Sequence, residues 1–181
     1  LFDMYRLLLS LLLCFTLSST CAQEHFYDFI YYGESSNPTN FYKVGNTAYF
    51  TAVNKNSNLC LYKTDGSKTG TELVYEFTNG ASLIRNFVEY GERIFFMVYT
   101  PKGTQIWYTK GDVQNTKMFY QSQPFHQNRE IDLYAFNDWF FYQDQISEDS
   151  FYVRRIDTSL TNNIIVARHK HGYQYGKGNF V

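Results

Sequence analysis

Three aspartates recur along the chain, each in a short polar segment: Asp65, Asp112 and Asp157. Repeated carboxylates could bind a calcium ion, or could act as acid and base on a glycosidic bond. An aspartate in a tight turn more often accepts a hydrogen bond from the backbone two residues further along the chain. Because all three lie in segments rich in turn-forming residues, we expect them to stabilise turns and predict no catalytic or metal-binding role for them.

Two histidines, His169 and His171, are two residues apart and would therefore lie on the same face of a strand. Such a pair could bind zinc, but a zinc site needs further histidine, cysteine or carboxylate ligands. The sequence places no such ligand beside them, and His25 and His126 have no partner either. Phosphate-binding loops, Gly-x-Ser-x-Gly motifs and paired Cys-x-x-Cys motifs are also absent. The sequence therefore predicts no catalytic residue, no metal ligand and no cofactor.

The elements that must position these residues follow a repeat of about 46 residues. Val44, Tyr90 and Phe136 are 46 residues apart, and each is followed at once by a pair of turn-forming residues. Those residue types tolerate the positive φ angle of a tight hairpin turn. The aligned segments are FYKVGNTAYFTA (41–52), FVEYGERIFFMV (87–98) and LYAFNDWFFYQD (133–144). Each segment is therefore expected to form a β-hairpin.

Two further runs of strand length follow each hairpin. The third runs are LYKT (61–64), WYTK (107–110) and YVRR (152–155), and the fourth are ELVYEF (72–77), KMFYQS (117–122) and IIVARH (164–169). We align the third runs at steps of 46 and 45 residues. The second run RIFFMVY (93–99) is continuously apolar after its arginine, so this strand must be covered on both faces. Four antiparallel strands in about 45 residues, stacked between neighbours, are typical of a β-propeller blade.

We therefore predict an all-β protein whose residues 41–181 form an incomplete β-propeller, with an irregular β-sandwich as the alternative fold. The predicted blades are 41–80, 87–125 and 133–170, preceded by a lead-in segment over 23–40. A partial fourth blade is predicted at 173–181, because YGKGNFV (175–181) matches YGERIFF (90–96) in its Tyr-Gly start and apolar end. Since propellers close with about four to eight blades, we expect the natural protein to be longer than this chain.

The N-terminal 22 residues have the layout of a secretory signal peptide. Arg6 precedes an apolar run from Leu7 to Leu17, and small polar residues follow. Cleavage is expected after Ala22, or alternatively after Cys21, and residues 1–3 are interpreted as lying upstream of the true start, Met4. The run is too short to span a bilayer as a helix, although an uncleaved membrane anchor is the competing interpretation.

Cleavage at this place would leave a single cysteine, Cys60, in the mature chain. Secreted proteins commonly use pairs of cysteines in disulfides, so Cys60 either is a buried apolar residue or pairs beyond this chain. We favour burial, because the surrounding NLCLYK is strand-like and free cysteine is usually buried.

The segment LCLYKTDGSKTGTELVYEF (59–77) resembles the ELWxxDGT repeat family. Leu61-Tyr62 stands for Leu-Trp, and the matching turn and strand residues are Asp65-Gly66-Ser67, Gly70-Thr71 and Leu73-Val74. The match departs from the family at Cys60, where the motif has Glu, and the second and third copies keep little beyond Trp107 and Asp157. The resemblance implies a secreted or surface propeller without catalytic residues. Propellers of the low-density-lipoprotein-receptor type match less well, because their Tyr-Trp-Thr-Asp signature is missing.

The charge balance of 16 basic against 17 acidic residues gives no electrostatic footprint for nucleic acid. The aromatic content is high, with 17 tyrosines, 17 phenylalanines and 2 tryptophans, and these residues favour half-buried strands. We predict a non-enzymatic, secreted binding or scaffold module with no membrane span in the mature chain. Its partner would be an extracellular protein or a glycan that the sequence does not identify.

Two other functions compete with this hypothesis. A glycan-acting enzyme would need acid–base residues on the innermost strands of the propeller, where the sequence supplies only Lys43, Glu89 and Asp132, which we judge not to be at equivalent positions. A glycan-binding module would instead use exposed aromatic rings, which sequence alone does not distinguish from core aromatic residues.

Overall fold

The computed structural model describes residues 35–122, 131–147 and 150–170, and in these ranges it contains twelve β-strands and no helix. The all-β prediction is therefore confirmed for the described part of the chain. The predicted signal peptide, most of the lead-in segment and the predicted fourth repeat lie outside it. No helix capable of crossing a bilayer occurs among the described residues.

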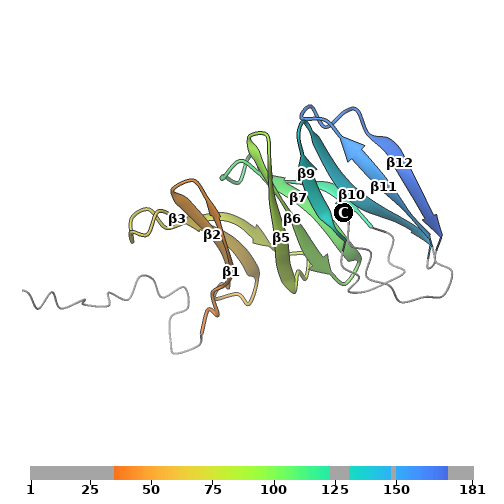
Figure 1. The fold of residues 1–181 in the computed structure, drawn as a ribbon. Helices are drawn as coiled ribbons and strands as arrows, with labels where there is room; N and C mark the ends of the chain where they lie inside the picture. The colour runs from red at the N-terminus through yellow and green to blue at the C-terminus, as the bar shows by residue number, and fades with distance from the viewer. Residues whose placement is uncertain (1–34, 123–130, 148–149, 171–181) are drawn as a thin grey trace, which may run out of the picture.

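The strands form three four-stranded antiparallel sheets, each built from strands consecutive in sequence (Figure 1). The first sheet contains β1 (Thr39–Val44), β2 (Thr47–Val53), β3 (Leu59–Thr64) and β4 (Glu72–Phe77). The second contains β5 (Leu83–Tyr90), β6 (Arg93–Thr100), β7 (Gly103–Thr109) and β8 (Lys117–Gln121). The third contains β9 (Leu133–Phe136), β10 (Trp139–Ser147), β11 (Ser150–Ile156) and β12 (Ile164–Lys170). The three sheets follow one another in a row, in chain order.

The hairpin that opens each sheet turns as the sequence predicts. Gly45, Gly91 and Asn137 have φ angles of 57°, 59° and 52°, and each directly follows the last residue of a first strand. The first strands end at Val44, Tyr90 and Phe136, so the 46-residue step is a true structural repeat.

The third strands repeat at a different step from the expected one. Tyr62 pairs with Phe50 and Trp107 pairs with Phe96, and the two phenylalanines are themselves 46 residues apart. Tyr62 and Trp107 are therefore equivalent residues at a step of 45, and the alignment of LYKT with WYTK is wrong by one residue. The loop between the second and third strands is shorter in the second sheet, which the apolar pattern of the strands alone does not reveal.

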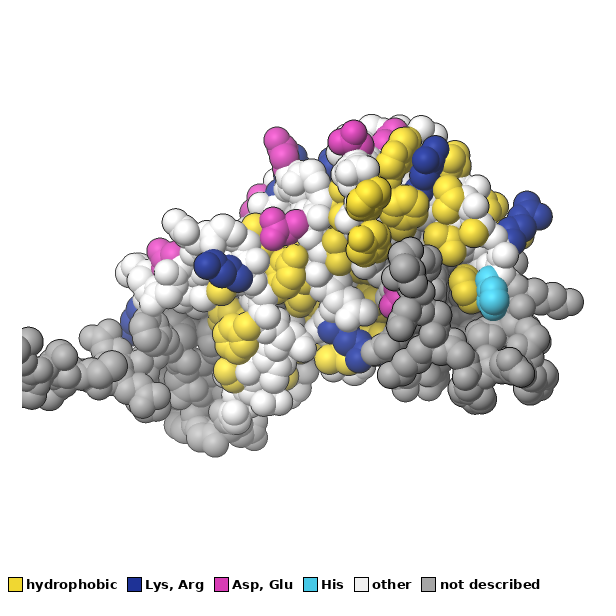
Figure 2. Space-filling view, in the orientation of Figure 1, with side chains coloured by type: hydrophobic (Ala, Val, Ile, Leu, Met, Phe, Trp, Pro, Cys, Tyr) yellow, Lys and Arg dark blue, Asp and Glu magenta, His cyan; other side chains and the backbone are white. Residues whose placement is uncertain are grey.

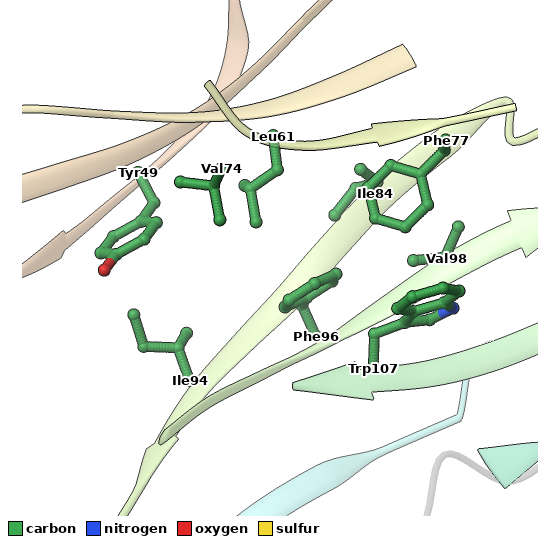
Figure 3. Packing of buried hydrophobic residues seen from close by; sticks show 9 residues of the cluster. All are labelled: Tyr49, Leu61, Val74, Phe77, Ile84, Ile94, Phe96, Val98 and Trp107. Atoms are coloured by element: carbon green, nitrogen blue, oxygen red, sulfur yellow. The ribbon is translucent and has the colours of Figure 1, made fainter. Parts of the chain in front are cut away.

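Each sheet has a forward face, toward the sheet that follows in sequence, and a backward face, toward the sheet that precedes it. The forward face of the first sheet packs on the backward face of the second (Figure 3). Phe77 meets the ring of Trp107 edge-on at 5.1 Å between centroids, an arrangement that aromatic pairs prefer. The buried residues of this interface are Tyr49, Leu61, Val74, Phe77, Ile84, Ile94, Phe96, Val98 and Trp107.

The forward face of the second sheet packs in the same way on the backward face of the third. Phe95 and Phe140 stack with ring centroids 4.2 Å apart. The buried residues here are Tyr90, Phe95, Met97, Tyr99, Ile106, Ile131, Phe140, Tyr142 and Ile156. Strand β6 is thus covered on both faces, and its residues from Ile94 to Val98 are at most 5% exposed, which confirms the interpretation of its continuous apolar run.

Polar contacts also join the second and third sheets. The Tyr90 hydroxyl donates to the main-chain carbonyls of Asp138 and Ile156, and Arg93 Nη1 donates to the carbonyl of Thr158 at 2.9 Å. Asp138 and Thr158 lie in turns outside the strands, so side chains of the second sheet provide hydrogen-bond donors for turn carbonyls of the third.

A charged cluster lies between the same two sheets. The Asp144 carboxylate accepts hydrogen bonds from the Tyr120 hydroxyl and from Arg154 Nε. Burial raises the pKa of the Tyr120 hydroxyl, and its bond to Asp144 raises it further, so the proton remains on tyrosine. Arg155, on the other face, places its guanidinium 3.9 Å from the Trp139 ring centroid. Arg154 and Arg155 are therefore both held by neighbouring side chains.

Burial of Phe95 between two sheets predicts a large cost for its removal. We expect Phe95→Ala to lower the free energy of unfolding by about 3–5 kcal/mol, because the large side chain leaves a cavity. Val113 is 53% exposed, so the control Val113→Ala should change it by no more than about 0.5 kcal/mol. Urea denaturation of both variants measures the difference, and equal values would contradict this packing.

Cys60 is fully buried, as expected, and its Sγ lies 3.5 Å from the carbonyl of Asn58. Burial raises the pKa of the thiol to about 11, with the Glu76 carboxylate adding to the effect. Since the thiolate is the reactive form, we expect a thiol reagent to modify Cys60 in the native protein only as fast as the protein opens. Rapid modification without denaturant would show that this part of the first sheet is exposed.

Candidate functional site

The aspartates of the third-to-fourth-strand turns bond to their own turns. The Asp65 carboxylate accepts hydrogen bonds from the backbone N–H of Ser67 at 2.8 Å and from its hydroxyl at 2.7 Å. Asp157 accepts the same pair of bonds from Ser159, at 3.1 and 2.6 Å. The predicted bond to the backbone two residues further on is thus confirmed at both sites. The pKa of each carboxyl is lowered, first by the serine hydroxyl and then by backbone N–H groups.

Asp112 belongs to a different position of the turn. Its carboxylate accepts a hydrogen bond from the backbone N–H of Asn115, three residues further on, at 2.9 Å. In the 45-residue step, Asp112 corresponds to Ser67 and not to Asp65. The sequence interpretation of three equivalent aspartates is therefore wrong: only Asp65 and Asp157 are equivalent, 92 residues apart.

A threonine pair closes the turn in the first two sheets. The hydroxyls of Thr64 and Thr71 lie 2.8 Å apart, and those of Thr109 and Thr116 lie 2.7 Å apart. The first threonine of each pair also accepts the N–H of a glycine two residues later. The second copy thus keeps the hydrogen bonds of the turn, although its sequence KGDVQNTKMF (110–119) differs from that of the first.

The three candidates on or beside the first strands of the sheets are all exposed: Lys43, Glu89 and Asp132. Lys43 pairs with Ala48 and Glu89 pairs with Ile94, so these two occupy equivalent positions, contrary to the sequence interpretation. Strand β5 lies beside both β1 and β9, which brings the edges that carry these residues next to one another.

Asp132 is the third member of another set, which the sequence analysis missed. Asn40 and Asn86 precede it at 46-residue steps, and both adopt positive φ angles, 54° and 57°, within a β-bulge. Asparagine tolerates this conformation better than most residues. The sequence signal was available, because the 46-residue spacing continues upstream of the aligned segments.

The three residues of this set contact the second strand of their sheets at an equivalent place. Asn40 Nδ2 donates to Thr51 Oγ1 at 3.3 Å, and Asn86 Nδ2 donates to Met97 Sδ at 3.4 Å. Asp132 Oδ2 accepts from Gln143 Nε2 at 3.4 Å, again at the 46-residue step. Asp132 therefore occupies a recurrent structural position, although its carboxylate differs chemically from the two amides. Bulges re-aim side chains and are common beside binding sites.

The forward face of the third sheet contains a groove of ≈ 560 Å³. Figure 2 shows hydrophobic side chains gathered over this sheet. Tyr134 and Phe136 are 61% and 56% exposed, while Asp132 and Gln143 provide the polar lining. The other lining residues are Phe141, Tyr142, Val153, Val166 and Ala167. Such a surface can hold an apolar or aromatic group, or the apolar side of a sugar ring, with one carboxylate and one amide available for hydrogen bonds.

The predicted histidine pair is not assembled within the described residues. The ring of His169 packs at 5.0 Å from that of Phe151, whereas His171, His25 and His126 lie outside the described part of the chain. Among the described residues, no group of three or more histidines, cysteines and carboxylates is placed to hold a metal ion.

Comparisons with known proteins give only distant structural likeness. No protein-family model and no curated protein matches the chain. Among solved structures, Zg3597, a family 117 glycoside hydrolase from the marine bacterium Zobellia galactanivorans, is similar with a TM-score of 0.46 and 7% sequence identity. The match covers 80% of this chain and 50% of the hydrolase, so the chain spans about half the length of that protein. A likeness of this size is no evidence of a shared activity.

The turn bonds of Asp65 predict a defined response to pH. Because its folded-state pKa lies below the ordinary value of 3.8, its contribution to stability is present above that value and is lost as the pH falls through the lowered pKa. Ser67→Ala removes the largest cause of the shift, so we expect the pKa of Asp65 to rise in an NMR titration. The equivalent turn is the internal control: the pKa of Asp157 should not move.

Proposed function

We propose that this protein is a secreted β-propeller repeat protein that acts as a non-enzymatic binding or scaffold module for an extracellular protein or glycan. The observation that carries the proposal is a difference between two groups of polar residues, those that recur in the repeats and those that vary. Those that recur bond within the repeat itself, as Asp65 and Asp157 do in their turns. On the first strands, those that vary at an equivalent position are exposed, as Lys43 and Glu89 are.

This division suits recognition because a fixed framework can present different side chains without a change in the fold. The first strands of successive sheets carry a lysine in one copy and a glutamate in the next, and the set of Asn40, Asn86 and Asp132 carries an amide twice and then a carboxylate. Binding specificity can therefore change at these positions while the interfaces between sheets stay as they are.

The propeller architecture is supported by three sheets of identical strand order whose first strands lie side by side. A radial arrangement of blades brings the first strands together around an axis. Secretion is supported by the N-terminal sequence, in which a basic residue, an apolar run and small residues follow one another.

The test is to express the complete secreted protein and measure binding to a glycan array and to a panel of extracellular proteins, with a panel of glycosidase substrates alongside. We expect saturable binding without turnover. Exchange of charge at the inner edge, by Lys43→Glu or Glu89→Lys, should weaken binding about tenfold or more without a shift in Tm, because both side chains are exposed. Val113→Ala, at an exposed site in a turn, is the matched control.

Turnover of a glycoside that is abolished by Glu89→Gln or Asp132→Asn would overturn the proposal and establish the enzyme hypothesis. Binding that survives both charge exchanges would instead place the recognition surface elsewhere on the molecule, against the inner edge proposed here.

A further inference from the structure

The groove on the third sheet is built from positions that are buried in the first two sheets. Tyr49, Phe95 and Phe141 are equivalent residues of the second strands, 46 residues apart. The first two are 6% and 0% exposed, because the next sheet covers them. The third lines the groove.

The same relation holds on the third strands. Leu61, Ile106 and Val153 pair with residues that are themselves 46 apart, namely Thr51, Met97 and Gln143. Leu61 and Ile106 are fully buried in the two interfaces between sheets, whereas Val153 lines the groove.

The last residues of the first strands show the largest contrast. Tyr90 is 4% exposed where the third sheet covers it, while its equivalent Phe136 is 56% exposed. Three strands of the third sheet therefore present, in an open groove, the residues that form a closed core in the second.

A cation–aromatic pair at the edge of this face also occupies positions that contact the next sheet in the preceding repeat. In the second sheet, Arg93 lies over the ring of Tyr108 and donates to the carbonyl of Thr158 in the turn of the next sheet. In the third sheet the equivalent positions hold Trp139 and Arg155, with the cation and the ring exchanged. Arg155 Nε is buried and has no hydrogen-bond partner among the described residues.

In the interface between the first and second sheets, a turn of the second sheet packs on the same edge of the first. Gly111, in the third-to-fourth-strand turn of the second sheet, packs so closely on Tyr49 that a Cβ atom would lie 2.8 Å from the tyrosine hydroxyl. In both interfaces, then, the turn of the following sheet rests on the second and third strands of the preceding one.

We propose that the forward face of the third sheet is the docking surface for a fourth four-stranded sheet of the same chain. The inference rests on the proposed propeller architecture and identifies the surface that continues it. The sequence favours this occupant, because YGKGNFV (175–181) matches YGERIFF (90–96) of the first hairpin of the second sheet in its Tyr-Gly start and apolar end. The residues of the fourth sheet replace water in the groove, and a carbonyl of its third-to-fourth-strand turn accepts a hydrogen bond from Arg155, as Thr158 does from Arg93.

A second copy of the chain fits this surface less well. Its first sheet would have to supply the docking face, but the backward-face residues of that sheet are already at most 8% exposed: Phe50, Ala52, Cys60 and Tyr62. A continuation of the same chain needs no such uncovering.

The experiment measures thiol accessibility in the complete secreted protein. Val153→Cys tests the docking surface, Ile106→Cys is the equivalent buried control, and Val113→Cys is the exposed control. We expect a thiol reagent to modify Val153→Cys about 100-fold or more slowly than Val113→Cys, and about as slowly as Ile106→Cys, because a buried site reacts only when the sheets open. Phe136→Cys provides the same test if Val153→Cys does not fold.

Modification of Val153→Cys as fast as Val113→Cys would overturn the docking proposal. Protection that appears only with a bound glycan or protein would make the groove a ligand site, and protection that depends on protein concentration would assign it to a second copy; either result also rejects the fourth sheet. These rates are measured without ligand, so a failed docking proposal is distinguishable from a failed binding function, which the charge exchanges at Lys43 and Glu89 test.

Discussion

The packing of each sheet's apolar face on its neighbour is the interaction on which the rest of this structure depends. A single four-stranded sheet with aromatic residues on both faces is not stable in water, since neither face removes its rings from solvent. Phe95 and Phe96 are adjacent in β6, point to opposite faces and are both fully buried, one against each neighbouring sheet. Strand β6 therefore has no solvent face, and the stability of the second sheet is inseparable from that of its neighbours, as in other repeat proteins.

The turns serve this packing and account for most of the recurrent polar residues. The side chain of Asp65 occupies the space beside Gly70 where a Cβ atom would lie, about 2.0 Å from the carboxylate oxygen, so a larger residue there would displace the aspartate. Gly111 makes the corresponding close approach to the neighbouring sheet. Turn residues that would invite a catalytic or metal-binding interpretation are thus fixed by the need to hold a compact turn against the next apolar face.

The interface between the second and third sheets shows how a repeat accommodates charge within this constraint. On the second strands, the equivalent residues are Ala52, Val98 and Asp144. On the third strands, the equivalent residues are Tyr62, Trp107 and Arg154. Their strand partners, Phe50, Phe96 and Tyr142, are 46 residues apart. An apolar pair in the second sheet is thus replaced by an ion pair in the third. The side chains of Arg154 and Asp144 are only 24% and 15% exposed, and a charge so nearly buried must be paired. The Tyr120 hydroxyl, from the sheet opposite, completes the pairing and makes the contact specific to this interface.

The sequence by itself determined the features that depend on local pattern. Four strand runs per repeat, hairpin turns at Gly45, Gly91 and Asn137, and a doubly covered β6 all follow from residue type and spacing, since turn conformation and alternation of side chains are properties of short segments. The one-residue shift between Tyr62 and Trp107 was not accessible in this way, because loop length moves a strand without altering its apolar pattern.

Only the tertiary structure decided which residues are exposed and which aspartates are equivalent. Phe95 and Phe141 are the same residue type at the same place in the repeat, yet one is buried and the other lines an open groove. The difference lies in the presence of a neighbouring sheet, which no local segment encodes. Likewise, Asp112 resembles Asp65 in sequence, but the pairing of the strands on either side of the turn makes it equivalent to Ser67, two residues after Asp65. Exposure and equivalence are properties of contacts between distant segments, and residue type and spacing alone do not specify those contacts.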